Sequence, residues 1–165
     1  MITFPRFYPY ALFFMLLSVL CSCGNDITGD SIDYIDFGPS GMTPEKEYLF
    51  RPFDNLSDSE FGKESRFEIM LAVRYTDICK LQSLPLVVET SSTSVDSITT
   101  EKVSIVLYDA ENKPTGKGHY GVYETISPLW SSMVPTENFT IAIKTTQLDS
   151  SGIMALGVIC NQTSH

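Results

Sequence analysis

The chain has 165 residues, a formal net charge of −9 at pH 7 and a hydrophobic content of 43%. A chain of this length is expected to form one domain with a core of its own. Its acidic balance argues against non-specific binding to nucleic acid, whose phosphates are met by Lys and Arg, and against holding an anionic membrane surface by charge.

The first residues follow the order of a secretory signal. Arg6 precedes an uncharged apolar run over residues 11–23, which is too short for a permanent membrane span. Residues 20–23 (Leu-Cys-Ser-Cys) resemble the lipobox of bacterial lipoproteins. The resemblance implies that residues 1–22 are a lipoprotein signal peptide and that Cys23 carries acyl chains, which anchor the protein in a membrane. The alternatives are a cleaved signal without lipid and a retained helix.

Residues 23–43 are rich in Gly, Ser, Pro and Asp. This composition predicts a flexible, lipid-anchored tether, although residues 30–37 leave room for a short first strand. A single folded domain is then expected over residues 44–165.

Apolar and polar residues alternate in several segments of this domain, as in half-buried strands. The clearest is residues 66–76, where every second side chain from Phe67 to Tyr75 is apolar. Its other face carries Glu68 and Arg74, with Met70 and Ala72 between them. The other predicted strands are residues 46–53, 84–90, 102–109, 138–146 and the nearly continuous apolar run 153–160.

Residues that interrupt regular structure mark the connections between the predicted strands. The Ser- and Thr-rich residues 91–100 are expected to form a loop, and residues 110–116 a turn that joins 102–109 to 117–124 as a hairpin. No segment has a sustained helical period with caps. We therefore expect an all-β fold, an antiparallel β-sandwich or jelly roll.

Removal of the leader takes Cys21 away, and acylation would occupy Cys23, which leaves Cys79 and Cys160. An oxidising compartment permits a disulfide between them, worth on the order of 4 kcal/mol in the loop-entropy model. The alternative is that both are small core residues that never meet. The sequence leaves both open.

The search for chemistry finds no catalytic set. The two histidines are His119 and His165, and the motifs of zinc proteases, serine hydrolases and phosphate-binding loops are missing from the sequence. We expect no enzymatic activity, no cofactor and no metal. Tyr120, Tyr123 and Trp130 suggest a second hypothesis, a surface glycan-binding lipoprotein with an aromatic platform, but such rings are more often packed in or against a core.

Several segments resemble the gliding-motility lipoprotein H family. They are residues 67–75, 83–89, 106–109 with Lys113, Gly116 and Gly118, 139–144, and 153–159 with Gly157. The sequence departs from the family pattern at Pro114-Thr115, where a tryptophan is common, and at residues 147–149, which replace a Met-containing step.

This resemblance implies one β-rich domain in a non-catalytic lipoprotein of the cell envelope that takes part in moving adhesins over the cell surface. It implies attachment through Cys23 to the outer membrane of a Gram-negative bacterium, on its periplasmic or its surface face. The expected partners are other envelope proteins, bound at an exposed strand edge or at the loops of one end.

Overall fold

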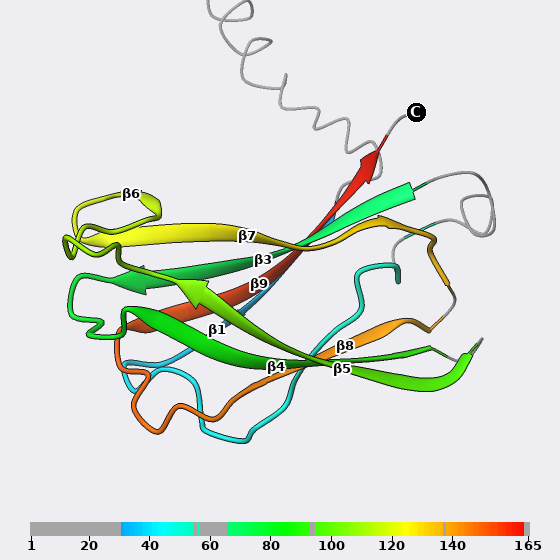
Figure 1. The fold of residues 1–165 in the computed structure, drawn as a ribbon, viewed down its shortest axis with the longest axis horizontal. Coiled ribbons are helices and arrows are strands. Elements are labelled where there is room, and N and C mark those ends of the chain that lie inside the picture. Colours follow the sequence, from blue (N-terminus) through cyan, green and yellow to red (C-terminus); the bar gives the residue numbers. More distant parts are fainter. Residues whose placement is uncertain (1–30, 55, 57–65, 93–94, 137, 164–165) are drawn as a thin grey trace, which may run out of the picture.

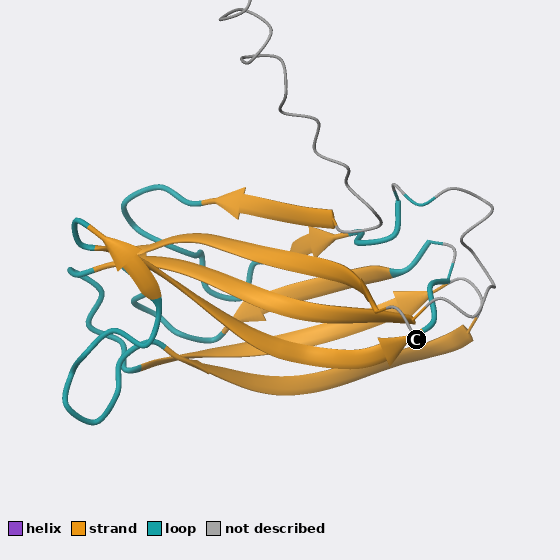
Figure 2. Cartoon of the chain, turned by 90° about the horizontal axis from the view of Figure 1, so that it is seen from above, coloured by secondary structure: helices purple, strands orange, loops and turns teal. Residues whose placement is uncertain are grey.

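The structure is a computed structural model that describes residues 31–54, 56, 66–92, 95–136 and 138–163. Within these residues the chain forms nine strands and no helix, arranged as two antiparallel sheets that face each other (Figures 1 and 2). The predicted all-β sandwich is thereby confirmed. The predicted signal peptide, residues 1–22, and Cys23 lie outside the described residues.

The two sheets have five and four strands. The five-stranded sheet has the order β1-β9-β3-β7-β6 and the four-stranded sheet the order β2-β8-β4-β5. The strands are β1 (Ser31–Asp36), β2 (Tyr48–Phe50), β3 (Arg66–Thr76), β4 (Ser83–Ser92), β5 (Val95–Val106), β6 (Lys117–His119), β7 (Val122–Met133), β8 (Thr140–Thr145) and β9 (Ile153–Thr163).

The core lies between the sheets and is built by the alternation seen in the sequence. Phe67, Ile69 and Leu71 of β3 are fully buried against side chains of β4 and β8 such as Leu84 and Ile141. Strand β9 lies between β1 and β3, and its residues from Ala155 to Cys160 are all buried. The expected inward positions of residues 66–76 and 138–146 are thus confirmed.

The folded body begins earlier than residue 44. Strand β1 pairs with β9 over its whole length, from Ser31 opposite Cys160 to Asp36 opposite Ala155. Residues 31–43 therefore belong to the sandwich, and the predicted tether 23–43 is wrong in this part. The short strand that the sequence left room for is the outermost strand of the larger sheet.

Two predicted connections are also wrong. Most of the segment 91–100 is not a loop, because Ser91 and Ser92 end β4 and Val95 begins β5 in one long hairpin. The turn 110–116 does not close a hairpin, because β5 pairs with β4 in the smaller sheet while β6 pairs with β7 in the larger one. The turn instead carries the chain from one sheet to the other.

Only the first three residues of β7 fall within a predicted strand, residues 117–124. The register of β7 against β3 shifts between Ile69 and Met70, which pair with Trp130 and Pro128, so Leu129 is an extra residue in a β-bulge. The bulge breaks the period of two. Proline has no backbone N–H to donate to a neighbouring strand. Pro128 is tolerated because β6 pairs only with Val122–Glu124 and does not reach Pro128.

Candidate functional site

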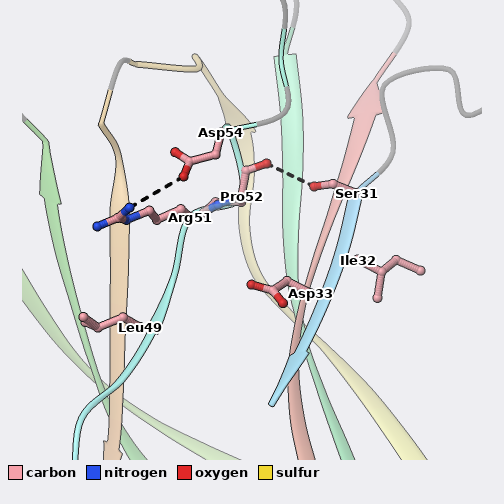
Figure 3. A pocket seen from close by; sticks show the side chains of 7 residues that line it. All are labelled: Ser31, Ile32, Asp33, Leu49, Arg51, Pro52 and Asp54. Atoms are coloured by element: carbon pink, nitrogen blue, oxygen red, sulfur yellow. Dashed lines mark hydrogen bonds and ion pairs between the residues drawn. The ribbon is translucent and has the colours of Figure 1, made fainter.

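The open side of the sandwich is the first candidate site. Strands β1 and β2 are the outermost strands of their sheets, and a hollow of about 510 Å³ lies between them (Figure 3). It is lined by Ser31, Ile32, Asp33, Leu49, Arg51, Pro52 and Asp54. A second hollow of about 550 Å³ continues it along the strands as far as Lys46 and shares Leu49 with it. Together they form what we call the β1–β2 groove.

One hydrogen bond joins the two walls of this groove at its first end. The Ser31 hydroxyl donates a hydrogen bond to the carbonyl oxygen of Pro52 at 3.0 Å. Arg51 lies 3.8 Å from the Asp54 carboxylate, and the Asp33 side chain lies in the hollow (Figure 3). The groove therefore offers an acidic lining and an exposed Leu49 to a partner.

Further along, the groove is closed by aromatic packing. Phe37, just after β1, lies edge-on to Tyr48 of β2 with the ring centroids 5.0 Å apart. The Tyr48 hydroxyl accepts a hydrogen bond from the backbone N–H of Thr43 at 2.8 Å. The floor of the groove is thus fixed by contacts between the two sheets, which makes it a preformed surface.

The second candidate is a polar network on the outer face of the larger sheet, the face turned away from the smaller sheet. The hydroxyl of Tyr34 and the guanidinium of Arg74 each donate to the same Glu124 carboxylate oxygen at 3.0 Å. The Arg74 guanidinium also lies 4.9 Å from the centroid of the Tyr34 ring. Burial, followed by the hydrogen bond and charge of Glu124, raises the pKa of Tyr34.

Gly157 makes this network possible. Tyr34 lies opposite Gly157 in the β1–β9 pair, and its ring crosses the position where a Cβ would stand. A Cβ built on Gly157 would lie 2.5 Å from a ring carbon of Tyr34. The glycine therefore lets the ring lie flat on the sheet and reach Glu124 on β7, three strands from β1.

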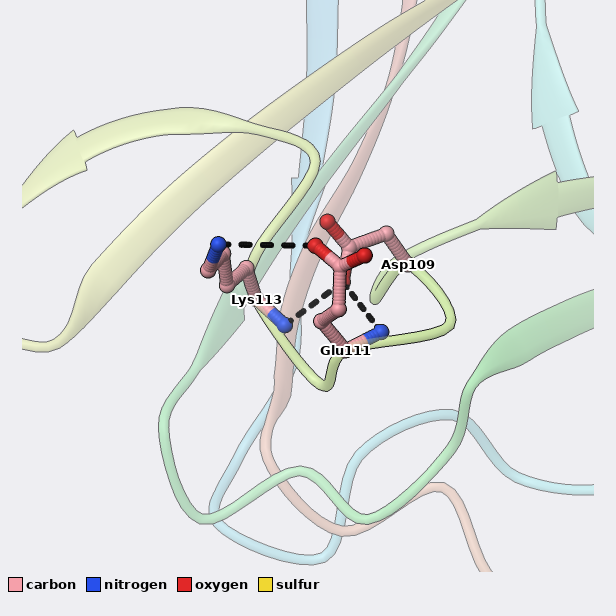
Figure 4. Close-up of polar contacts among 3 residues, drawn as sticks. All are labelled: Asp109, Glu111 and Lys113. Carbon is pink, nitrogen blue, oxygen red and sulfur yellow. Dashed lines mark hydrogen bonds and ion pairs between the residues drawn. The ribbon is translucent and has the colours of Figure 1, made fainter.

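The far end of the sandwich carries the turn after β5. Asp109 accepts hydrogen bonds from the backbone N–H groups of Glu111 and Lys113, both at 2.9 Å, while the side chains of Glu111 and Lys113 lie 3.4 Å apart (Figure 4). The Asp109 carboxylate holds the turn in shape. This aspartate belongs to the segment 106–109 that resembles the family, and its contacts give it a structural role.

The two cysteines that could have formed a disulfide are far apart. Cys160 lies opposite Ile69 near one end of β3, whereas the backbone N–H of Cys79 bonds to the carbonyl of Thr76 at the other end. Seven strand residues separate these levels, or about 23 Å, and a disulfide needs Cα atoms within about 7 Å. Both cysteines are buried without a disulfide, as core residues. Burial raises the pKa of the Cys79 thiol.

The three aromatic residues proposed for a glycan platform do not share a surface. Tyr123 and Trp130 lie opposite the buried Tyr75 and Ile69, so both turn toward the core and pack against it. Six residues of β3 separate the two levels, about 20 Å. Tyr120 alone is fully exposed, in the turn before β7.

Both candidate surfaces went unnoticed in the sequence. The groove depends on β1, which lies in a segment whose composition is that of a tether. The only signal was its alternation of Ile32 and Tyr34 with acidic residues. For the outer face of the larger sheet, the signal was the pair Met70 and Ala72, two apolar residues on the otherwise polar face of residues 66–76.

The described part of the chain has neither a metal-binding cluster of side chains nor a membrane-spanning helix. No group of three or more His, Cys, Asp or Glu side chains there is placed to hold a metal ion. In the same residues no helix has the length and hydropathy to cross a membrane.

Comparisons with known proteins assign no family. No protein-family model matches the chain, and no curated protein matches it. A solved structure, that of tomato aspermy virus determined by X-ray crystallography, aligns over 94% of this chain and 95% of its own, with 8% identity and a TM-score of 0.32. A likeness at this level carries no conclusion about this chain.

Proposed function

We propose that this protein is a non-catalytic lipoprotein of the cell envelope that binds another envelope protein along the β1–β2 groove. The observation that carries the proposal is the position of β1. The first described strand after the lipobox-like residues 20–23 is also an outermost strand of the larger sheet. Eight residue steps separate Cys23 from Ser31, and a fully extended chain spans about 3.5 Å per residue, so the groove starts within about 28 Å of the proposed anchor.

The groove offers two means of binding a protein. An open strand edge presents backbone N–H and C=O groups to which an extended segment can add as a further strand. Exposed Leu49 of β2 lies across the hollow from that edge and supplies apolar contact. The acidic lining favours a partner segment that alternates apolar and basic residues.

The wider role that we propose follows from the resemblance to the gliding-motility lipoprotein H family. The protein would sit at the outer membrane, held by acyl chains on Cys23, as a component of an assembly that moves adhesins. A strain that lacks the gene should then lose surface spreading, and the wild-type gene should restore it. A gene carrying Cys23→Ser should not.

Crosslinking tests the groove. A photoreactive amino acid at Leu49, in the full chain expressed in its native host, should form a covalent adduct with a specific envelope protein. The matched control is Ser104, which is exposed on the outer face of the smaller sheet and opposite Pro85. Adducts at neither position, or the same adducts at both, would contradict binding along the groove.

Intact-mass measurement of the membrane form tests the anchor separately. The expected mass lacks residues 1–22 and includes acyl groups on Cys23. An unmodified chain of 165 residues would refute the lipoprotein proposal.

A further inference from the structure

The outer face of the larger sheet carries two complete rows of apolar residues. The strand registers align one row across β1, β9, β3 and β7 as Ile32, Ile159, Met70 and Pro128. They align the neighbouring row as Tyr34, Gly157, Ala72 and Ile126. We call these two rows the apolar face.

The fold itself does not require these rows. Antiparallel sheets commonly turn polar residues to solvent on the face away from the core, and the smaller sheet does so. On its outer face Lys144 lies 3.2 Å from Glu89 and 3.9 Å from Glu47. The apolar rows are therefore specific to one outer face of the sandwich.

The apolar face is open to solvent along its two outer strands, β1 and β7. Ile32 is 60% exposed, Ile126 is 50% exposed, and Pro128 is exposed as well. Between them Ala72 and Gly157 are buried, and the Tyr34 ring lies flat across Gly157. The result is a flat surface with apolar side chains standing at its two edges.

Polar rows border the apolar face on both sides. On one side lies the row that contains Arg74, Glu124 and Asp36, in which Arg74 and Glu124 neutralise each other in an ion pair of 3.0 Å. On the other side Glu68 lies opposite Asn161. The apolar band is thus narrow and bounded by groups suited to water or to lipid headgroups.

The position of the face favours a membrane as its partner. Ile32 is the second residue of β1 and nine residue steps from Cys23, so the apolar face begins where the chain arrives from Cys23, within about 32 Å of that residue at about 3.5 Å per step. We propose that the apolar face rests on the membrane surface, with Ile32, Ile126 and Pro128 entering the boundary between headgroups and acyl chains. This inference rests on the lipid anchor of the proposed function.

A second copy of the chain fits this face less well. Four strands spaced about 4.8 Å apart and two rows about 6.7 Å apart cover on the order of 250 Å², whereas a stable dimer buries about 800 Å² on each partner. A membrane contact does not need that area, because an anchor close to the face holds the two surfaces at a high effective concentration.

Environment-sensitive labels test the proposal in the whole protein. The full-length gene is expressed, and the acylated chain is purified from membranes and reconstituted at about one copy per vesicle of zwitterionic phosphatidylcholine. One variant carries a fluorophore at Ile126→Cys and the matched control carries it at Ser104→Cys, on the opposite outer face. Buried Cys79 and Cys160 should label weakly, which the unsubstituted protein measures.

The fluorescence emission of the label at position 126 should shift to shorter wavelength. Quenchers carried by the lipids should reduce its fluorescence intensity several-fold more than that of the label at position 104. High salt should not change this, because the contact is apolar. Equal quenching at both positions would overturn the proposal. Shielding at position 126 from water-soluble quenchers without quenching by lipid would overturn it too, since a protein surface would then cover the face.

Intact mass of the same preparation separates the two proposals. An acylated Cys23 together with a solvated label at position 126 overturns the membrane-facing sheet and leaves the anchor standing. A chain without acyl groups overturns the anchor, and the membrane-facing sheet falls with it.

Discussion

Two contacts between strands depend on a single small group. One is the hydroxyl group of Tyr75, and the other is the hydrogen atom that Gly157 has in place of a side chain. The Tyr75 hydroxyl is buried at the far end of the sandwich, where it donates to the carbonyl oxygen of Leu107 and accepts the N–H of Gly116 at 3.1 Å. It joins β3 to the segment that crosses between the sheets, so it fixes the connection that replaces the expected hairpin.

Tyr75→Phe should lower the free energy of unfolding by about 1–2 kcal/mol, because the N–H of Gly116 loses its hydroxyl partner while the ring still fills its space. Urea denaturation measures this as a lower midpoint with an unchanged slope. Tyr120→Phe is the control, since Tyr120 is fully exposed. An equal loss in both variants would argue against the role assigned to the Tyr75 hydroxyl.

Gly157 and Tyr34 should be coupled. Gly157→Ala places a methyl group in the Tyr34 ring, and we expect a loss of about 1–3 kcal/mol from the displaced side chain. In a Tyr34→Ala background the same substitution should cost much less. A double-mutant cycle gives the coupling, and additive effects would show that the ring does not lie over the glycine.

At the scale of strands, the β4–β5 hairpin extends beyond the part of the sheet that the core supports. Ile105 near the end of β5 is buried, whereas Ile98 is 72% exposed. The pairs nearest the turn, such as Thr90 with Thr99, are formed by residues with little apolar surface to bury. Stability should therefore fall along the hairpin toward its turn.

Amide hydrogen exchange should reveal this gradient. We expect the hydrogen-bonded amides of residues 103–106 to exchange at least tenfold more slowly than those of residues 98–100. Strand β8 serves as the internal reference, because Ile141 and Ile143 are fully buried. Uniform protection along β5 would contradict the gradient.

The same strands show what the sequence can predict. Strands β3 and β8 were predictable because their period of two reflects one buried face, as in Ile141 and Ile143. The Ser- and Thr-rich end of the β4–β5 hairpin was not, since it forms strands by backbone pairing without an apolar face. The part of β7 after residue 124 was missed because the bulge at Leu129 breaks the period.

The candidate surfaces were harder to predict than the strands. A groove between β1 and β2 depends on which strands end up outermost, and local alternation says nothing about that order. The apolar face needs the registers of three strand pairs before Ile32, Met70 and Pro128 can be seen as one row.

For the whole molecule, stability should fall in alkaline solution. Burial is the main cause that raises the pKa values of Cys79, Tyr34 and Tyr108, whose ordinary values are 9.0, 10.0 and 10.0. The hydrogen bond to Glu89 likewise raises the pKa of Lys144. Each group binds its proton more tightly in the folded chain, so its contribution is fully present below the ordinary pKa and is lost as pH rises through the folded one.

Urea midpoints should accordingly stay level up to about pH 9, the ordinary value for Cys79, and decline above it. Cys79→Ala should flatten the first part of that decline. A midpoint that rises with pH in this range would contradict the assigned directions.

The pairing of β1 with β9 also has a mechanical consequence. Ser31 lies at the end of the sandwich opposite the turns around Asp109 and Gly121, because β1 and β3 are both antiparallel to β9 and run the same way. A pull between residue 31 and those turns acts along the strand axes, so all six residue pairs of β1 and β9 share the load in shear. Tension applied across the strands would break the residue pairs one after another. The β1–β9 pair should therefore withstand far more force in shear than in tension across the strands.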